Sequence, residues 1–395
     1  MKKTLLAAAL MVGFAGVAQA DTSVTLYGIL DGGIGYNKIK GSALPGVDDN
    51  GRTLNPYAAD GRVGFDAKRT GMINGIQSGN RWGLKGSEDL GNGLRAVFQL
   101  ESGFNLGTGN SAQSGRLFGR QATLGLAGDS WGQLDFGRQT NIASKYFGAI
   151  DPFALGFDQA NLGGVISAAN TARYDNMVMY QTPNFSGFQF GVGYSFNVDG
   201  DQDPKWNVGG VQDPDDNKKA WTTGLRYANG PINVALTYDQ FKDNNGIQEV
   251  GTGGVTAKSW NLGGAYDFEV VKLHLAGGQT RHGMFATQTY AGEAFLPSFQ
   301  GLDGLKVNSY MVGLSAPVGA GNVMASWTMG DIRSAPDRNA AADSEFKNQN
   351  TYSLGYTHPL SKRTNVYAIG SYAKNVHFAP DAKSTLVGLG LRHQF

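Results

Sequence analysis

Charged side chains occupy alternate positions in two neighbouring stretches of the sequence. Arg81 and Lys85 alternate with apolar residues, and Arg95 and Glu101 do the same in the following stretch. Because successive side chains of a β-strand point to opposite faces, each stretch would carry its charges on one face. Charges gathered on one surface attract ions of one sign and repel ions of the other. The two stretches therefore predict a hairpin with one charged face and one apolar face.

A catalytic centre is not indicated. The chain contains no cysteine, which excludes disulfides, thiolate catalysis and thiolate metal sites. The histidines are scattered over different segments, which argues against a Ser/His/Asp hydrolase. They are His274, His282, His358, His377 and His393. We expect neither an enzyme nor a bound cofactor or metal.

Three aspartates imitate the start of a calcium-binding loop. They are Asp199, Asp201 and Asp203. Pro204 replaces the glycine that such a loop requires, and Gly210 stands where the bidentate glutamate should be. We interpret the segment as a solvated loop, with loose binding of a divalent ion as the alternative.

The end of the chain has the clearest strand pattern. Apolar residues fall on one parity and small or polar residues on the other, namely Val387, Leu389, Leu391 and Phe395 against Gly388, Gly390, Arg392 and Gln394. This alternation suits a wall between lipid and a watery lumen. We predict a membrane β-barrel in which Leu389 and Leu391 face lipid and Gly390 faces the lumen, so that Gly390→Ser should be mild.

The start of the chain indicates export. Lys2 and Lys3 precede an apolar segment over 5–17, and residues 18–20 form a small-x-small cleavage site, so residues 1–20 are predicted to be a secretory signal peptide. Residues 21–395 would form one barrel domain. Removing the two lysines changes 33 basic and 32 acidic residues to a net charge of −1 (31 against 32), which gives no reason to expect nucleic acid as a partner.

Alternating segments separated by polar, glycine-rich breaks recur along the chain. No apolar run beyond the first 20 residues reaches the roughly 20 residues of a membrane-spanning helix, so any crossing must use strands. A closed barrel leaves no backbone group unpaired in lipid. We predict an all-β fold, an antiparallel transmembrane β-barrel of about 16 strands with short periplasmic turns and long extracellular loops. The long segments are 37–77, 139–173, 197–219, 242–257, 279–304 and 331–347.

Short motifs also occur in a specific order along the mature chain. They are SVTLYG at 23–28, RWGLKGSEDLG at 81–91, FQLESG at 98–103, FGRQ at 136–139, PNFSGF at 183–188, LSKRT at 360–364 and GLRHQF at 390–395. This set resembles the general porins of Gram-negative bacteria, of the betaproteobacterial and neisserial type. The resemblance implies a 16-stranded homotrimeric diffusion channel of the bacterial outer membrane, whose third long loop folds into the lumen. It further implies contact with outer-membrane lipid and lipopolysaccharide, and a terminal Phe395 that the barrel-assembly machinery reads.

Under this interpretation the function resides in one constriction of the pore. By strand parity, Arg81, Lys85 and Arg95 would form a basic patch on one wall of the lumen, whereas the acidic groups would be divided between Asp31, Glu101 and Asp151. The alternative is that these residues are solvated charges far from the narrowest level. Arg138 shares the parity of the lipid face and could contribute only if the strand ends there. Gln121, like Met179, occupies an inward position where relatives often carry a basic or polar group, which weakens the expected anion preference.

The segment 139–173 holds Asp151 and Asp158 among several large apolar residues. A loop tucked against the inner wall can bury such residues, whereas an external loop would have to pack on a neighbouring subunit, which is the alternative. The run 149–153 resembles the tip of the family's constriction loop. Asp151 is therefore expected to face the arginine wall and to set a transverse field across the pore.

Two other functions compete with a weakly anion-selective passage for small ions and solutes. A substrate-specific channel, such as a sugar porin, would need a track of stacked aromatic residues, and inward Tyr27 and Tyr367 are too few. An outer-membrane adhesin or enzyme would need a passenger domain or a catalytic cluster, but strands occupy the chain from end to end.

Overall fold

The computed structural model describes residues 23–43, 63–202, 207–208, 211–212, 217–243, 254–286, 288, 290, 303–334 and 346–395. The expected signal peptide, residues 1–20, lies outside these residues, as do Asp203, Pro204 and Gly210 of the aspartate-rich loop.

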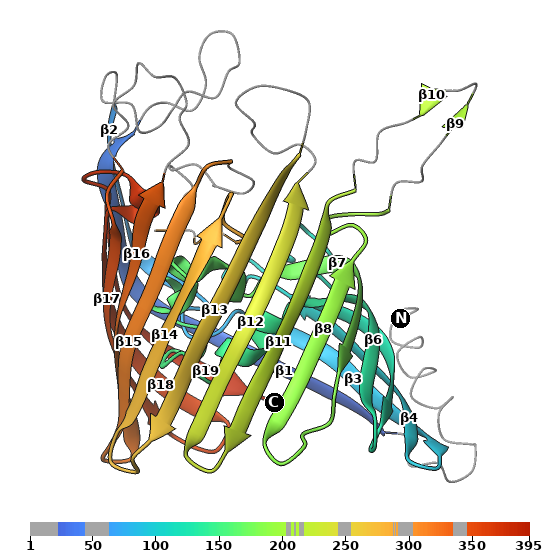
Figure 1. Cartoon of the computed structure of the whole chain (residues 1–395). Helices are drawn as coiled ribbons and strands as arrows, with labels where there is room; N and C mark the ends of the chain where they lie inside the picture. Colours follow the sequence, from blue (N-terminus) through green and yellow to red (C-terminus); the bar gives the residue numbers. More distant parts are fainter. Residues whose placement is uncertain are drawn as a thin grey trace, which may run out of the picture.

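Antiparallel strands make up most of the described chain (Figure 1). They are β1 (Ser23–Ala43), β2 (Val63–Asn74), β3 (Arg81–Gly91), β4 (Leu94–Gly103), β5 (Gln121–Gly128), β6 (Gly132–Thr140), β7 (Arg173–Gln181), β8 (Phe188–Ser195), β9 (Asn207–Val208), β10 (Val211–Gln212), β11 (Lys219–Asn229), β12 (Ile232–Asp243), β13 (Val255–Asp267), β14 (Lys272–Arg281), β15 (Lys306–Val318), β16 (Gly321–Ser334), β17 (Gln349–Pro359), β18 (Thr364–Lys374) and β19 (Lys383–Gln394). The small pair β9 and β10 is a separate sheet.

The remaining seventeen described strands form one sheet that closes on itself, because β1 pairs with β19. Two of them are parts of one interrupted strand. The pairing along β1 runs from Gly32 opposite Asn74 of β2 to Ile29 opposite Arg81 of β3, and both partners run antiparallel to β1. Counting β2 and β3 as one interrupted strand, the barrel therefore has 16 strands, as expected. The expected loop 37–77 is shorter than predicted, since β1 continues to Ala43 and β2 begins at Val63.

Alternation along the strands separates an outer apolar face from an inner face. On β19, Val387, Leu389 and Leu391 are 52%, 65% and 49% exposed, whereas Leu386 is 1% exposed. An apolar outer band of this kind is what a barrel presents to lipid. Among the described residues, no helix is long and apolar enough to cross a membrane.

Short turns and longer connections alternate along the barrel. The short turns gather at the lower end of the barrel in Figure 1, as between β3 and β4 or β15 and β16. Because neighbouring strands are antiparallel, the longer described connections, 104–120, 141–172 and 375–382, leave from the opposite end.

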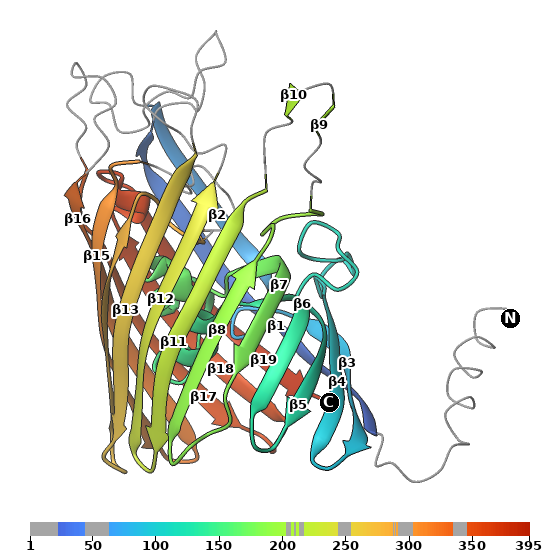
Figure 2. The ribbon, with the colours of Figure 1, turned by 45° about the vertical axis from the view of Figure 1, so that its right-hand side comes forward.

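Segment 141–172, between β6 and β7, lies inside the barrel (Figure 2). It contains α2 (Ile142–Phe147) and the short helices η1 (Asp158–Ala160), η2 (Leu162–Gly164) and η3 (Ser167–Ala169). Its backbone contacts the inner wall at several strands: the Ile142 N–H donates to Thr222 of β11 at 2.8 Å, the carbonyl of Ile150 lies 2.7 Å from His274 Nδ1 of β14, and the carbonyl of Val165 accepts from Ser309 of β15 at 2.7 Å. The infolded loop is thus confirmed, and the alternative of an external loop is wrong.

The infolded loop is held by an apolar core inside the lumen. Ile142, Phe147, Leu162 and Ile166 have no exposed surface and pack with wall residues such as Met179. Each large side chain of this size buried from water stabilises the arrangement by about 1.5 to 3 kcal/mol. This explains why a segment so rich in apolar residues lies in a watery barrel.

Candidate functional site

A polar cavity of about 680 Å³ lies between the inner wall and the infolded loop. We call it the waist. Its wall side is formed by the stretch 75–79 together with Arg81, Arg120 and Arg173 of β7, and its loop side includes Leu155, Asp158, Asn161, Asn170 and Thr171. Because the infolded loop lies against the wall here, an ion in this cavity would lie close to charged side chains of both.

Three arginines line the waist, and in the described part of the chain Arg120 alone has a carboxylate within 3 Å. Arg120 Nε donates to Glu101 Oε1 at 2.6 Å, and the same oxygen lies 3.9 Å from Arg81 Nη1. Arg81 Nε donates to the carbonyl of Gly79 at 2.9 Å, and Arg173 Nη1 donates to the carbonyl of Thr171 at 3.3 Å. The Nε of Arg173 has no acceptor among the described residues. The wall of the waist therefore carries excess positive charge.

Asp158 is the acidic side chain on the loop side of the waist. Its Oδ1 accepts from Gln288 Nε2 at 3.2 Å. Burial raises the pKa of this carboxyl to about 6, so its charge depends on pH near neutrality. Asp158 therefore supplies a negative charge opposite the arginines.

Asp151 does not face the arginine wall, which differs from the expectation. The side chain is buried, and its carboxylate accepts backbone N–H groups of Phe153, Leu155 and Leu162 at 3.2, 2.9 and 3.4 Å. Burial raises its pKa to about 6 as well. A tight loop inside the barrel leaves backbone N–H groups without a backbone acceptor. The carboxylate of Asp151 accepts hydrogen bonds from these groups.

The other expected residues lie away from the waist on the inner side of the wall. Lys85 and Gln121 line a separate cavity of about 300 Å³, with the Lys85 ammonium 5.6 Å from the centre of the Tyr27 ring. Arg95 pairs with Asp129 at 3.0 Å beside a short turn, where both side chains are well exposed. Glu101 reaches the waist only through its contacts with the arginines.

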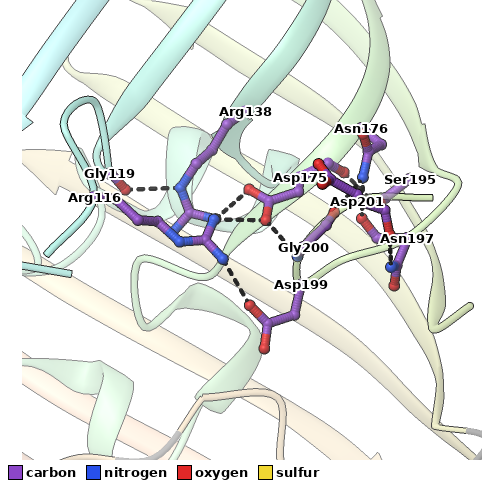
Figure 3. A network of polar contacts seen from close by, with 10 residues as sticks. All are labelled: Arg116, Gly119, Arg138, Asp175, Asn176, Ser195, Asn197, Asp199, Gly200 and Asp201. Carbon is purple, nitrogen blue, oxygen red and sulfur yellow. Dashed lines mark hydrogen bonds and ion pairs between the residues drawn. The ribbon is translucent and has the colours of Figure 1, made fainter. Parts of the chain in front are cut away.

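Arg138 lies in a bulge between β6 and β7, where the register shifts after Gly137. Its Nε donates to the carbonyl of Gly119 at 2.8 Å, and its Nη1 pairs with Asp175 at 2.6 Å (Figure 3). Asp175 also pairs with Arg116 at 2.6 Å. Arg138 therefore fastens connection 104–120 to the rim, and it does not line the waist.

The aspartate-rich loop takes part in the ion pairs that Arg116 and Arg138 form with Asp175. Asp199 pairs with Arg116 at 2.8 Å, so its carboxylate serves an ion pair (Figure 3). In the described part of the chain, no group of three or more His, Asp or Glu side chains is placed to hold a metal ion.

Sequence reasoning missed two of the three waist arginines, Arg120 and Arg173. Arg173 ends the long segment 139–173, and a register shift in β7 separates it from Met179, so parity counted along the strand does not predict its position. Arg120 precedes β5 and gives no strand pattern. Met179 itself is covered by the infolded loop, so its lack of charge does not weaken the waist.

Inward tyrosines do not form an aromatic track among the described residues. Tyr27 donates to Glu101 at 3.0 Å, and Tyr367 is buried and donates to Asp31 at 2.6 Å. Nothing in their arrangement favours a sugar-specific channel.

Comparison with known proteins gives consistent similarities. The sequence profile of the Gram-negative porin family matches residues 7–377. The chain is 59% identical to an outer membrane porin protein of Bordetella pertussis and 31% identical to "Outer membrane porin protein 32" of Delftia acidovorans, in each case over 100% of both chains. A solved structure, "Anion-selective porin from Comamonas acidovorans", is similar with a TM-score of 0.67 and 27% identity, covering 95% of this chain and 100% of that one.

Proposed function

The chain belongs to the Gram-negative porin family, a family of channels without enzymatic activity, and we propose that its waist passes small anions in preference to cations. The protein is an outer-membrane diffusion channel for ions and small hydrophilic solutes. The proposal concerns its selectivity.

The observation that carries the proposal is the charge of the waist. Among the described residues, Arg81, Arg120 and Arg173 face two carboxylates, Glu101 and Asp158. Guanidinium groups stay charged at any physiological pH. One net positive charge in a narrow aqueous passage favours anions modestly, because salt screens it over about 8 Å. The anion-selective porin that resembles this fold supports the same conclusion.

Measurement of the zero-current potential across a planar bilayer under a KCl gradient tests this proposal. Wild type should give a potential with the sign of anion preference, and Arg173→Gln should move it toward cations. Arg95→Gln is the matched control, because it removes the same charge at the rim and should change the potential little. Equal shifts for both variants would show that the waist does not determine selectivity.

We further propose that three copies associate through the outer face that runs from β19 over β1, β3 and β4 to β5. Most exposed large side chains on the described part of this face are aliphatic, as with Ile34, Leu124 and Leu389, and Trp82 of β3 is also exposed, whereas β8, β11 and β13 expose several aromatic residues. Aromatic residues mark surfaces that meet the lipid interface. The aliphatic face therefore suits a protein neighbour, and Leu124→Glu should lower the mass of the detergent-solubilised assembly from trimer to monomer.

The outward face near the long loops suits the phosphate groups of lipopolysaccharide. Lys40 of β1 lies directly opposite Lys383 of β19, which lies opposite Lys374 of β18. Like charges directly opposite each other destabilise a sheet, and bound anions remove that penalty. Replacing the three lysines by glutamine should reduce the lipopolysaccharide that copurifies, whereas Lys362→Gln at the short-turn end should not. Equal retention by all variants would exclude this surface.

A further inference from the structure

The second strand of the barrel, which consists of β2 and β3, is interrupted beside the waist. Six residues, Gly75–Asn80, stand opposite only Leu30 and Asp31 of β1, because pairing passes directly from Asn74 to Arg81. Residues 75–79 of this break line the waist cavity. The break therefore places extra backbone where a continuous strand would leave space for the passage.

Asp31 holds the break in place. Its Oδ2 accepts from the Ser78 N–H at 2.6 Å, and its own N–H donates to Asn80 Oδ1 at 2.6 Å. Its carbonyl accepts from Asn80 Nδ2 and from the Gly75 N–H, both at 3.0 Å. The residue has no exposed surface. Asp31 thus contributes no side chain to the passage but binds the break at both ends and in the middle.

Tyr367 connects this anchor to the infolded loop. Its hydroxyl donates to Asp31 Oδ1 at 2.6 Å, and its ring meets Phe157 edge to face at 5.5 Å between centroids. The N–H of Phe157 in turn donates to the carbonyl of Gln77 at 3.3 Å. Ile76 belongs to the same buried apolar cluster as Phe157 and Tyr367. The break and the loop tip are therefore one packed unit.

The loop tip needs such support because its backbone is strained. Ala154, Leu155 and Phe157 have φ values of 52°, 58° and 59°, in the left-handed region that non-glycine residues seldom adopt. Such conformations persist only where the surroundings over-determine them. Packing against the break supplies that constraint.

We propose that Gly75–Asn80 is a second constriction element and that Asp31 and Tyr367 are positioning residues that lock it to the loop tip. The bore is set by the break and the loop together. The break also fixes charge, because the carbonyl of Gly79 accepts from Arg81 at 2.9 Å and Ser78 Oγ accepts from Arg392 at 3.0 Å. This inference rests on the proposed function of the waist.

Thiol labelling tests whether the break lines the narrow section. The chain has no native cysteine, so an introduced thiol reports only its own position. A bulky uncharged thiol reagent should lower the single-channel conductance of Gly79→Cys by about half or more, and that of Thr25→Cys, in the cavity beside Lys85, by less than about a tenth. Equally small losses would overturn the proposal. A wild type with no conductance steps would instead contradict channel function itself.

Two conservative variants test the positioning roles. Tyr367→Phe keeps the ring on Phe157 but removes the hydroxyl, and Asp31→Asn keeps the shape but removes the charge. Both should change the single-channel conductance and shift the zero-current potential, since the break moves together with its arginine contacts. Asn37→Ala is the control, because it removes another buried polar side chain from the inner face of β1. If all three variants lose thermal stability while conductance and potential stay at wild-type values, the two residues are merely structural and the proposal fails.

Discussion

Acidification should strengthen the anion preference of the channel by neutralising Asp158. This carboxyl lines the loop side of the waist, and burial raises its pKa to about 6. A group with such a pKa is charged above about pH 6 and neutral below it. Between pH 8 and pH 5 the waist therefore loses most of one negative charge, while the guanidinium groups keep theirs.

The size of the effect follows from Coulomb's law. A unit charge about 8 Å from an ion in water changes the energy of that ion by about 0.5 kcal/mol. The change has opposite signs for anions and cations, which gives a difference of about 1 kcal/mol, or about fivefold in the permeability ratio. Screening at physiological salt, with a Debye length of about 8 Å, reduces this to about twofold.

The zero-current potential measured at pH 8 and pH 5 checks the prediction. Wild type should become about twofold more anion-preferring at the lower pH. Asp158→Asn should behave at pH 8 as wild type does at pH 5, and should lose most of its pH dependence. If Asp158→Asn titrates as wild type does, the titrating charge lies elsewhere and the assignment of Asp158 to the waist is refuted.

Three further predictions concern the wall of the barrel. Leu236→Arg, on β12 outside the proposed subunit interface, should destabilise the barrel by about 2 to 4 kcal/mol in thermal unfolding, whereas Gln240→Arg, on the same face nearer the rim, should cost about 0 to 1 kcal/mol; equal costs would contradict the lipid-facing parity. Gly390→Ser should alter conductance and stability, because an added Cβ would lie 2.2 Å from a neighbouring ring, whereas Gly370→Ser, with nothing within 4 Å, should behave as wild type on both measures. Deleting Phe395 should reduce outer-membrane insertion in cell fractionation, and Phe395→Tyr should restore it; full insertion of the truncated chain would leave Phe395 without a role in assembly.

The alternation of side chains was readable from the sequence because it depends only on strand geometry. The prediction that Leu389 and Leu391 face outward is confirmed, as are the closed barrel and the infolded loop. Strand parity also assigns Gly390 to the inner face. It does not show that the ring of Tyr367 fills the space beside Gly390, and this contact replaces the expectation that Gly390→Ser would be mild with the prediction that it is disruptive.

The waist was only partly predictable, because its composition depends on where the loop lies. Arg81 was placed by parity and lines the waist, but Arg95 has the same parity and lies at the rim. Strand parity predicts whether a side chain points into the lumen or outward. It does not predict where along the barrel axis the residue lies. Asp151 was assigned to the passage from its position in the loop, yet the loop's own N–H groups enclose it. The interruption between β2 and β3 begins within segment 37–77, whose sequence is typical of a continuous polar loop.

The most direct test of the account reverses the charge of the waist. Arg81→Glu combined with Arg173→Glu should leave a conducting channel, since neither side chain is part of the apolar core, and should change the sign of the zero-current potential under a KCl gradient from anion to cation preference. A double variant that conducts and keeps the wild-type potential would contradict the conclusion that these arginines select the ions that pass.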